Sequence, residues 1–136
     1  MKKLPAIINL NDVSKTFENG TIAVQDMSID VLKGQFISFL GPSGCGKSTV
    51  LKMISGLLKP TAGEIIFDNS GFESEGIEIG YVFQDATLMP WATVSENVYL
   101  PLRLKGVSKS KAADEIERVL IQVGLKDFYN SYPREL

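Results

Sequence analysis

The chain has 136 residues, of which 44% are apolar and 22% are charged, and its formal net charge is -2. This is the composition of one soluble globular domain, and a chain of this length can form a core without disulfides or a structural metal. The 14 basic residues are outnumbered by 16 acidic ones. Without a positive excess to attract a phosphate backbone, we expect no nucleic-acid partner.

The scarcity of histidine and cysteine excludes several kinds of catalytic and metal site. The sequence contains no histidine and one cysteine, Cys45. Ser-His-Asp and Cys-His catalytic sites, disulfides within the chain and zinc sites are therefore excluded. A reducing, cytosolic compartment fits this usage. The apolar run near the start is interrupted by Pro5 and is too short for a secretory signal, and no run approaches the roughly 18 apolar residues of a membrane span.

The first half of the chain predicts strands around one helix. Residues 7–17 and 22–31 predict two strands joined at Asn19 and Gly20, a pair that suits a tight hairpin because it tolerates positive φ. In the second strand, apolar Met27, Ile29 and Val31 alternate with polar residues, which predicts one buried face. Further strands are expected at residues 36–40, 64–68 and 77–84, the first of them covered on both faces.

Helices are predicted by apolar residues at helical spacing. One helix is expected from Ser48 to Leu58, ended by residues 59–60. Beyond Pro90 the pattern becomes helical: residues 93–96 form a capping box, and Pro101 should kink or end the helix that it opens. Residues 109–123 predict another helix, stopped by Gly124. Its expected apolar side carries Ala112, Ile116, Val119, Leu120 and Val123.

The most informative segment lies between the predicted strand at 36–40 and the helix that follows it. It matches G-x-x-x-x-G-K-[ST] through Gly41, Pro42, Ser43, Gly44, Cys45, Gly46, Lys47 and Ser48. The glycines allow successive N–H groups to converge on an anion, and the helix N-terminus adds partial positive charge. Lys47 can reach the terminal phosphates of a nucleotide, and the Ser48 hydroxyl can bind their magnesium ion. We therefore expect the phosphates of a magnesium-bound nucleotide to bind through this loop and Thr49, and the family resemblance given below implies that the nucleotide is ATP.

Two other features could be functional, but the sequence favours a structural role for each of them. Cys45 invites a nucleophilic or redox role, but the sequence offers no second cysteine or histidine base, which favours a small loop residue. Residues 64–68 resemble an apolar strand that ends in a magnesium-binding aspartate. The turn-like residues 69–71 that follow favour the edge of a hairpin instead.

Taken together, these motifs resemble the nucleotide-binding subunit of an ABC transporter along essentially the whole chain. Residues 13–17 resemble the family's aromatic loop, which implies that Phe17 stacks on adenine and Val24 lines the pocket; Phe17 otherwise simply packs the hairpin end. Residues 81–85 resemble its glutamine loop, which implies that Gln84 approaches magnesium and the attacking water. Lys47 and Gln84 are the expected catalytic residues, and Ser48 and Gln84 the expected metal ligands.

The resemblance also implies partners. Residues 86–98 are similar to importers of the nitrate, sulfonate and taurine group, and in the family this region meets a transmembrane permease. Leu88, Met89 and Trp91 are then interface anchors, although core packing is a close alternative for Trp91. A second ATP-binding subunit is implied as well, because the family binds ATP between two copies. The chain would thus lie in the cytoplasm, peripheral at the inner face of the membrane.

The implied fold is α/β: an incomplete P-loop NTPase core of ABC type, with an antiparallel β subdomain and the start of a helical subdomain. Within this one domain we expect a hairpin region at 1–34, the core at 35–89 and the helical start at 90–136. Residues 132–136 resemble the lead-in to the family's signature motif. The signature, the Walker B carboxylates and the switch histidine are not found, so whether the chain is an enzyme stays open and hydrolysis by it alone is not expected.

Three functional hypotheses follow from these residues. The first is the ATP-binding component of a membrane importer. The second is a non-catalytic nucleotide-binding or interaction module that occupies the permease. The third, a P-loop kinase or GTPase, is disfavoured because base-recognition motifs such as Asn-Lys-x-Asp are missing from the sequence.

Overall fold

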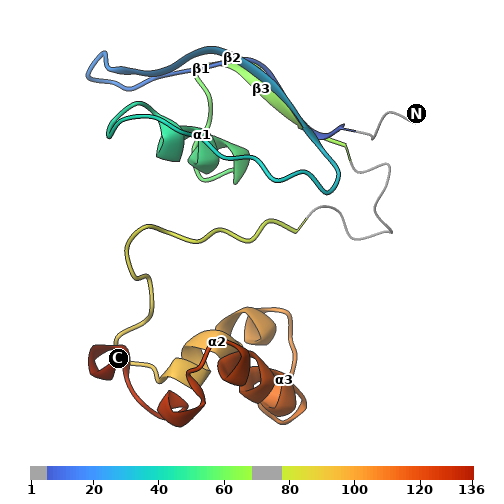
Figure 1. Ribbon diagram of the computed structural model, residues 1–136, viewed down its shortest axis with the longest axis vertical. Helices are drawn as coiled ribbons and strands as arrows, with labels where there is room; N and C mark the ends of the chain where they lie inside the picture. Colours follow the sequence, from blue (N-terminus) through green and yellow to red (C-terminus); the bar gives the residue numbers. More distant parts are fainter. Residues whose placement is uncertain (1–5, 69–77) are drawn as a thin grey trace. The chain divides into compact units, whose positions relative to one another are not determined.

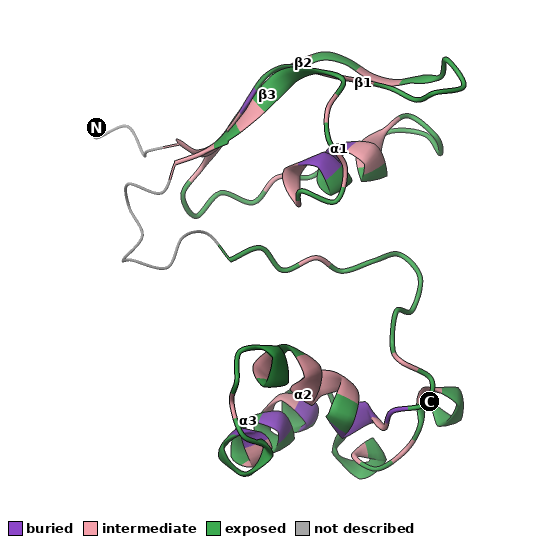
Figure 2. Cartoon of the chain, turned by 180° about the vertical axis from the view of Figure 1, so that it is seen from behind, coloured by how far each residue is buried: buried purple, intermediate pink, exposed green. Residues whose placement is uncertain are grey.

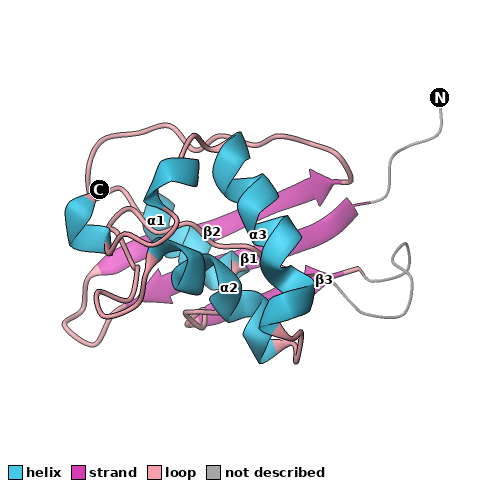
Figure 3. Ribbon diagram, turned by 90° about the horizontal axis from the view of Figure 1, so that it is seen from below, coloured by secondary structure: helices cyan, strands magenta, loops and turns pink. Residues whose placement is uncertain are grey.

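Two long strands begin the part of the chain that the computed structural model describes, residues 6–68 and 78–136. Strands β1 (Ala6–Thr16) and β2 (Ile22–Leu32) pair antiparallel, and Gly20 in their connecting turn has a φ of 81°. Strand β3 (Ala62–Phe67) pairs antiparallel with the other edge of β1, so the order is β2-β1-β3 (Figure 3). The predicted hairpin is confirmed.

The pairing of β1 with β2 is irregular at two aspartates that have positive φ, Asp12 at 48° and Asp26 at 45°. A serine of the opposite strand holds each one. The Ser28 hydroxyl accepts from the Asp12 N–H at 2.9 Å and donates to its carboxylate at 3.0 Å. Ser14 does the same for Asp26, at 2.8 and 3.2 Å. These bonds offset the cost of the left-handed conformation, which aspartate tolerates better than most residues.

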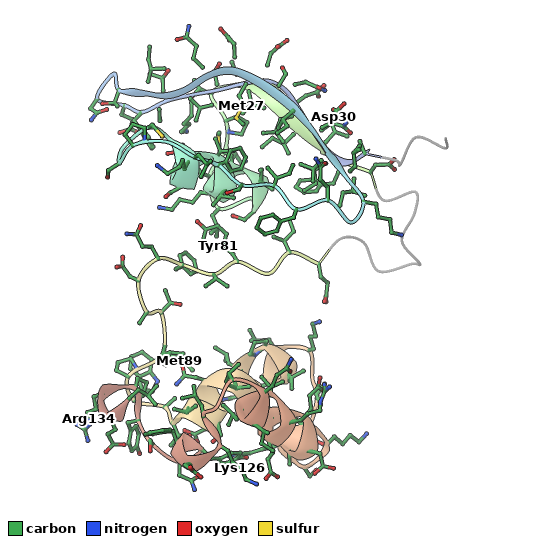
Figure 4. All side chains as sticks on the ribbon, viewed as in Figure 1. Met27, Asp30, Tyr81, Met89, Lys126 and Arg134 are labelled. Atoms are coloured by element: carbon green, nitrogen blue, oxygen red, sulfur yellow. The ribbon has the colours of Figure 1, made fainter. Side chains whose placement is uncertain are left out.

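The core of the first unit lies between the sheet and helix α1 (Lys47–Ile54), as Figure 1 shows. Val50 and Met53 of α1 pack against the buried side chains of Leu10 and Val13 on β1. Met27 of β2 is packed against this core from the same side of the sheet (Figure 4). The predicted alternation along β2 is confirmed, because Ser28 and Asp30 are exposed while their apolar neighbours are partly covered.

Helix α1 ends at Ile54, four residues before the predicted end at Leu58. Gly56 adopts a φ of 76° and donates to the Met53 carbonyl, while Leu58 donates to the Lys52 carbonyl. A glycine in this conformation turns the chain and satisfies the last helical carbonyls. Leu58 still packs against the core after the helix has ended. The apolar spacing therefore identified a core residue but not the helix boundary.

The strands expected at 36–40 and 77–84 are not found in the described residues. Residues 36–40 and 78–84 carry no strand, and Phe36, Leu40 and Val82 are 92%, 91% and 96% exposed. An apolar strand of a parallel sheet is stable only with partners that accept and donate its backbone hydrogen bonds. The sheet of the described residues consists of β1, β2 and β3, and neither segment is one of its strands.

The chain forms two compact units, Met1–Val82 and Phe83–Leu136. The second unit is helical, as predicted. It contains α2 (Val94–Leu104), α3 (Lys109–Gln122) and the short 3-10 helices η1 (Lys126–Phe128) and η2 (Pro133–Glu135). The buried cluster of its hydrophobic core comes from both long helices and consists of Val94, Ala112, Ile116 and Leu120; Figure 2 colours the chain by burial. Val123 was expected among them but is 60% exposed.

Helix α2 begins with the predicted capping box. The Glu96 N–H donates to the Thr93 hydroxyl at 3.3 Å, and the Thr93 N–H donates to the Glu96 carboxylate at 3.0 Å. Pro101 does not end the helix, which continues to Leu104. A proline removes one backbone donor, but here Lys105 still donates to the Pro101 carbonyl, and Leu102 packs against the core of the unit. Among the described residues, no helix has both the length and the apolar character to cross a membrane.

Candidate phosphate-binding site

The loop of residues 41–46 leads into α1 through glycines in the left-handed region, Gly44 at a φ of 82° and Gly46 at 94°. Gly46 is also the N-cap of the helix. A Cβ at Gly46 would lie 2.2 Å from the Ala23 carbonyl oxygen and 3.3 Å from the Val24 side chain. The loop therefore packs directly on the beginning of β2, and only glycine fits at this position.

The loop and the first turn of α1 present backbone N–H groups that have no acceptor among the described residues. They include those of Gly44, Gly46, Lys47, Ser48 and Thr49, and the first N–H bonded within the helix is that of Val50, which donates to the Gly46 carbonyl. No side chain caps this helix and no acidic residue lies in its first turn. Unpaired N–H groups at a helix N-terminus, next to residues with left-handed φ, form an anion-binding concavity.

Lys47 bridges the two ends of the loop. Its ammonium donates to the Gly41 carbonyl at 2.8 Å and to the Pro42 carbonyl at 2.6 Å, and lies 3.5 Å from the Cys45 sulfur. The ammonium has three N–H donors, and two of them bind the carbonyls. Because a thiol is a weak acceptor, the third N–H can bind a stronger acceptor instead. The sequence predicts the charge of Lys47, but not that its side chain also fixes the shape of the loop.

A pocket of about 380 Å³ borders the loop. Its walls come from β2, from the segment before the loop and from α1, and include Val24, Phe39, Cys45, Gly46 and Lys47. Val24, expected from the resemblance to line a nucleotide pocket, is therefore brought together with the loop. Ser48 is exposed, and its hydroxyl has no partner among the described residues, so it is free to bind a cation.

Phe17 follows β1 at the hairpin turn, and 40% of its surface is exposed. Its ring lies 5.7 Å from the Lys15 ammonium. A wide depression of about 510 Å³ around it is lined by residues 15–19 and Leu58. The ring is thus open to a stacking partner.

The remaining predicted site residues belong to the second unit. Gln84 is exposed in the segment that precedes α2. Leu88 is 44% and Trp91 is 75% exposed, whereas Met89 is partly buried. Trp91 is therefore not a core residue, which removes the alternative interpretation of it.

Sequence reasoning missed Asn97, which holds the turn that carries Trp91. Its side-chain oxygen accepts from the Met89 N–H at 2.7 Å, and its amide nitrogen lies 3.2, 3.1 and 2.9 Å from the carbonyls of Met89, Ala92 and Thr93. The available signal was an asparagine one turn inside a helix, where this residue type is unfavourable unless it bonds to backbone. Met89 and Trp91 line a pocket of about 430 Å³ with Glu96, Arg103 and Lys109.

Comparison with known sequences places these features in context. The model of a family described as ABC transporter matches residues 24–136. The taurine import ATP-binding protein TauB of Pelagibacter ubique is 41% identical over 124 residues, which cover 90% of this chain and 47% of that protein. An uncharacterized ABC transporter ATP-binding protein of Methanocaldococcus jannaschii is 37% identical over 132 residues, 95% of this chain and 49% of that protein. The chain thus spans about half the length of these curated relatives.

Solved structures show the same architecture. A dimeric ATP-binding cassette in a post-hydrolysis state, bound to ADP and Pi, superimposes with a TM-score of 0.83 at 34% identity, covering 95% of this chain and 62% of that chain. The cbiO1 protein of Clostridium perfringens, part of an ABC transporter complex, gives a TM-score of 0.73 at 24% identity and shows the fold alone, over 96% of this chain and 55% of the other. The predicted incomplete ABC-type fold is confirmed.

Proposed function

The chain belongs to the ABC transporter family, as one of its ATP-binding proteins, and from this premise we propose that it binds MgATP through residues 41–49 to energise solute import. One observation carries the proposal: unpaired N–H groups of the loop and of the first turn of α1 stand beside an ammonium that is already oriented. Such a cradle fits a triphosphate, which carries several negative charges on closely spaced oxygens.

The nucleotide would be held by groups with separate tasks. The loop N–H groups would donate hydrogen bonds to the phosphate oxygens, and Lys47 would neutralise their charge while it keeps its bonds to the loop carbonyls. Ser48 and Gln84 would supply oxygen ligands to Mg²⁺, which prefers such atoms. Phe17 would stack on the base, with Val24 as a wall of the pocket. When bound, ATP would supply the free energy for transport.

Partners and location belong to the same proposal. A permease would dock on the exposed residues near Trp91 and so hold the protein at the inner face of the membrane. A second ATP-binding subunit would complete the nucleotide site, as the dimeric state of the solved relative suggests. The taurine import relative supports the importer class. The hairpin region 1–34, the core 35–89 and the helical start 90–136 would be parts of one ATP-binding domain.

The proposal is tested by the affinity for MgATP, with binding rather than turnover as the readout. Lys47→Ala removes a charge-assisted contact of about 1.5–3 kcal/mol, so we expect binding to weaken roughly ten- to hundredfold. Isothermal titration calorimetry of both proteins measures this directly. Lys52→Ala is the matched control, because Lys52 lies on the same helix but is exposed and its ammonium has no described partner. Equal affinities of the Lys47→Ala and unmodified chains would refute the proposed site.

A further inference from the structure

The end of β1 is tied to the segment that follows α1. The Lys15 ammonium donates to the Lys59 carbonyl at 2.8 Å, and the Thr61 N–H donates to the Ser14 carbonyl at 2.8 Å. The Thr61 hydroxyl accepts from the Thr16 N–H at 3.0 Å and lies 3.2 Å from the Thr16 carbonyl. These contacts join residues that are more than 40 positions apart in the sequence. They fix the last residues before Phe17 relative to the exit of the helix that the phosphate loop begins.

Of the residues that make these hydrogen bonds, Lys15 also lies close to the aromatic ring of Phe17. It pairs with Val24 across the hairpin, and it lies two residues from the fully buried Val13, on the same face of β1. Its ammonium is 5.7 Å from the centre of the Phe17 ring, within the range of a cation–π interaction. No carboxylate among the described residues forms an ion pair with it. Its charge is therefore directed to a backbone carbonyl and to one face of an aromatic ring.

We propose that Lys15 is a positioning residue for the base of the nucleotide: anchored on the Lys59 carbonyl, its ammonium covers one face of the Phe17 ring and leaves the other face for a purine. The inference rests on the proposed function and deepens it. An exposed phenylalanine at a turn samples several rotamers, and holding it in one of them lowers the entropy lost when a base stacks on it. Binding of the phosphates by the loop does not depend on the contact between Lys15 and the Phe17 ring.

The test separates the base from the phosphates by comparing two ligands, MgATP and inorganic tripolyphosphate with Mg²⁺. Lys15→Met keeps a long unbranched side chain but removes the charge and the donors. We expect it to weaken MgATP binding about three- to tenfold, the scale of a partly lost stacking contact, and to leave tripolyphosphate binding unchanged. Lys15→Arg retains a cation and donors that can reach a carbonyl and an aromatic face, so it should bind MgATP as the unmodified chain does.

Two further variants make the result specific. Lys59→Met removes a neighbouring positive charge but keeps the carbonyl to which Lys15 donates, so it should leave both affinities unchanged. In a Phe17→Ala chain, adding Lys15→Met should cause no further loss of MgATP affinity, because the ring through which Lys15 acts is gone. Lys15→Gln repeats the test if Lys15→Met fails to fold, which circular dichroism would show.

Each outcome decides the proposal. An equal loss of both ligands in Lys15→Met or Lys15→Gln would mean that Lys15 acts on the phosphates, and a loss that persists without Phe17 would mean that it acts without the ring. Either result overturns the inference but leaves phosphate binding by the loop intact. If the unmodified chain binds neither ligand, the proposed function itself fails, and the role of Lys15 fails with it.

Discussion

At Gly46, the conformation of one residue decides whether the phosphate loop can lie against β2. Its φ of 94° favours glycine, and a Cβ there would meet the Ala23 carbonyl oxygen at 2.2 Å, well inside a van der Waals contact. The Ala23 oxygen is a backbone atom of a paired strand, so it cannot move away from the added Cβ as the end of a flexible side chain could. The close approach of loop and strand therefore depends on the absence of a side chain.

Gly46→Ala should weaken MgATP binding by at least tenfold and lower the free energy of unfolding by about 1–3 kcal/mol, because backbone strain and a clash coincide at this residue. Calorimetric titration and chemical denaturation measure the two effects. Gly106→Ala is the control: its φ is 78°, but nothing lies within 4 Å of the added carbon. It should cost some stability and leave affinity unchanged. Unaltered nucleotide affinity in Gly46→Ala would contradict this account of the loop.

Helix α2 shows how an element depends on its first turn. Besides the capping box, the N–H groups of Val94 and Ser95 donate to the carbonyls of Ser131 and Tyr129, at 2.9 and 3.1 Å. The free N–H groups at the start of α2 are therefore satisfied partly by backbone carbonyls of the segment between η1 and η2. The hydrogen bond from the Thr93 N–H holds the pKa of Glu96 below the ordinary glutamate value of 4.5, and the Lys109 ammonium adds a smaller effect in the same direction.

This lowered pKa predicts an acid-sensitive helix start. Because the folded-state pKa of Glu96 is below the unfolded value, its contribution to stability is present above pH 4.5 and is lost as the pH falls through the folded-state value. Carboxyl-carbon NMR should show Glu96 titrating below 4.5. Thr93→Ala removes the hydroxyl that accepts from the Glu96 N–H and should shift the titration upward. A Glu96 that titrates at or above its ordinary value in the unmodified chain would contradict the prediction.

At the scale of the whole molecule, the described residues form two units with separate hydrophobic cores. The first core centres on Leu10, Val13, Val50 and Met53, and the second on Val94, Ala112, Ile116 and Leu120, so they share no buried residue. Hydrophobic burial is the main stabilising contribution of each unit. A cavity in one core should therefore act on the backbone hydrogen bonds of that unit first.

Ile116→Ala and Leu10→Ala test this with one cavity in each unit, since both side chains are 1% exposed. Each truncation should cost about 2–5 kcal/mol. Hydrogen–deuterium exchange should show protection lost in α2 and α3 for Ile116→Ala, and in β1, β2 and α1 for Leu10→Ala. Equal loss of protection in both units from either variant would show that they unfold as one cooperative structure instead.

What the sequence determined about this protein was local. The hairpin at Gly20, the capping box at Thr93, the stop at Gly124 and the glycine loop before Lys47 each depend on neighbouring residues, so their patterns were sufficient. The conformation of the phosphate loop is also set locally, by glycines and by a lysine six residues from the carbonyl that it binds, although the pattern itself predicted only the charge of that lysine.

Only the tertiary structure decided the rest, because those features need partners far along the chain. The apolar segments at 36–40 and 77–84 were predicted to be strands, but a strand exists only with a hydrogen-bonded neighbour, and periodicity does not show whether one is there. The end of α1 at Ile54 followed from a glycine rather than from the last apolar residue. The link from Lys15 to the Lys59 carbonyl spans 44 positions, and no local pattern encodes such a contact.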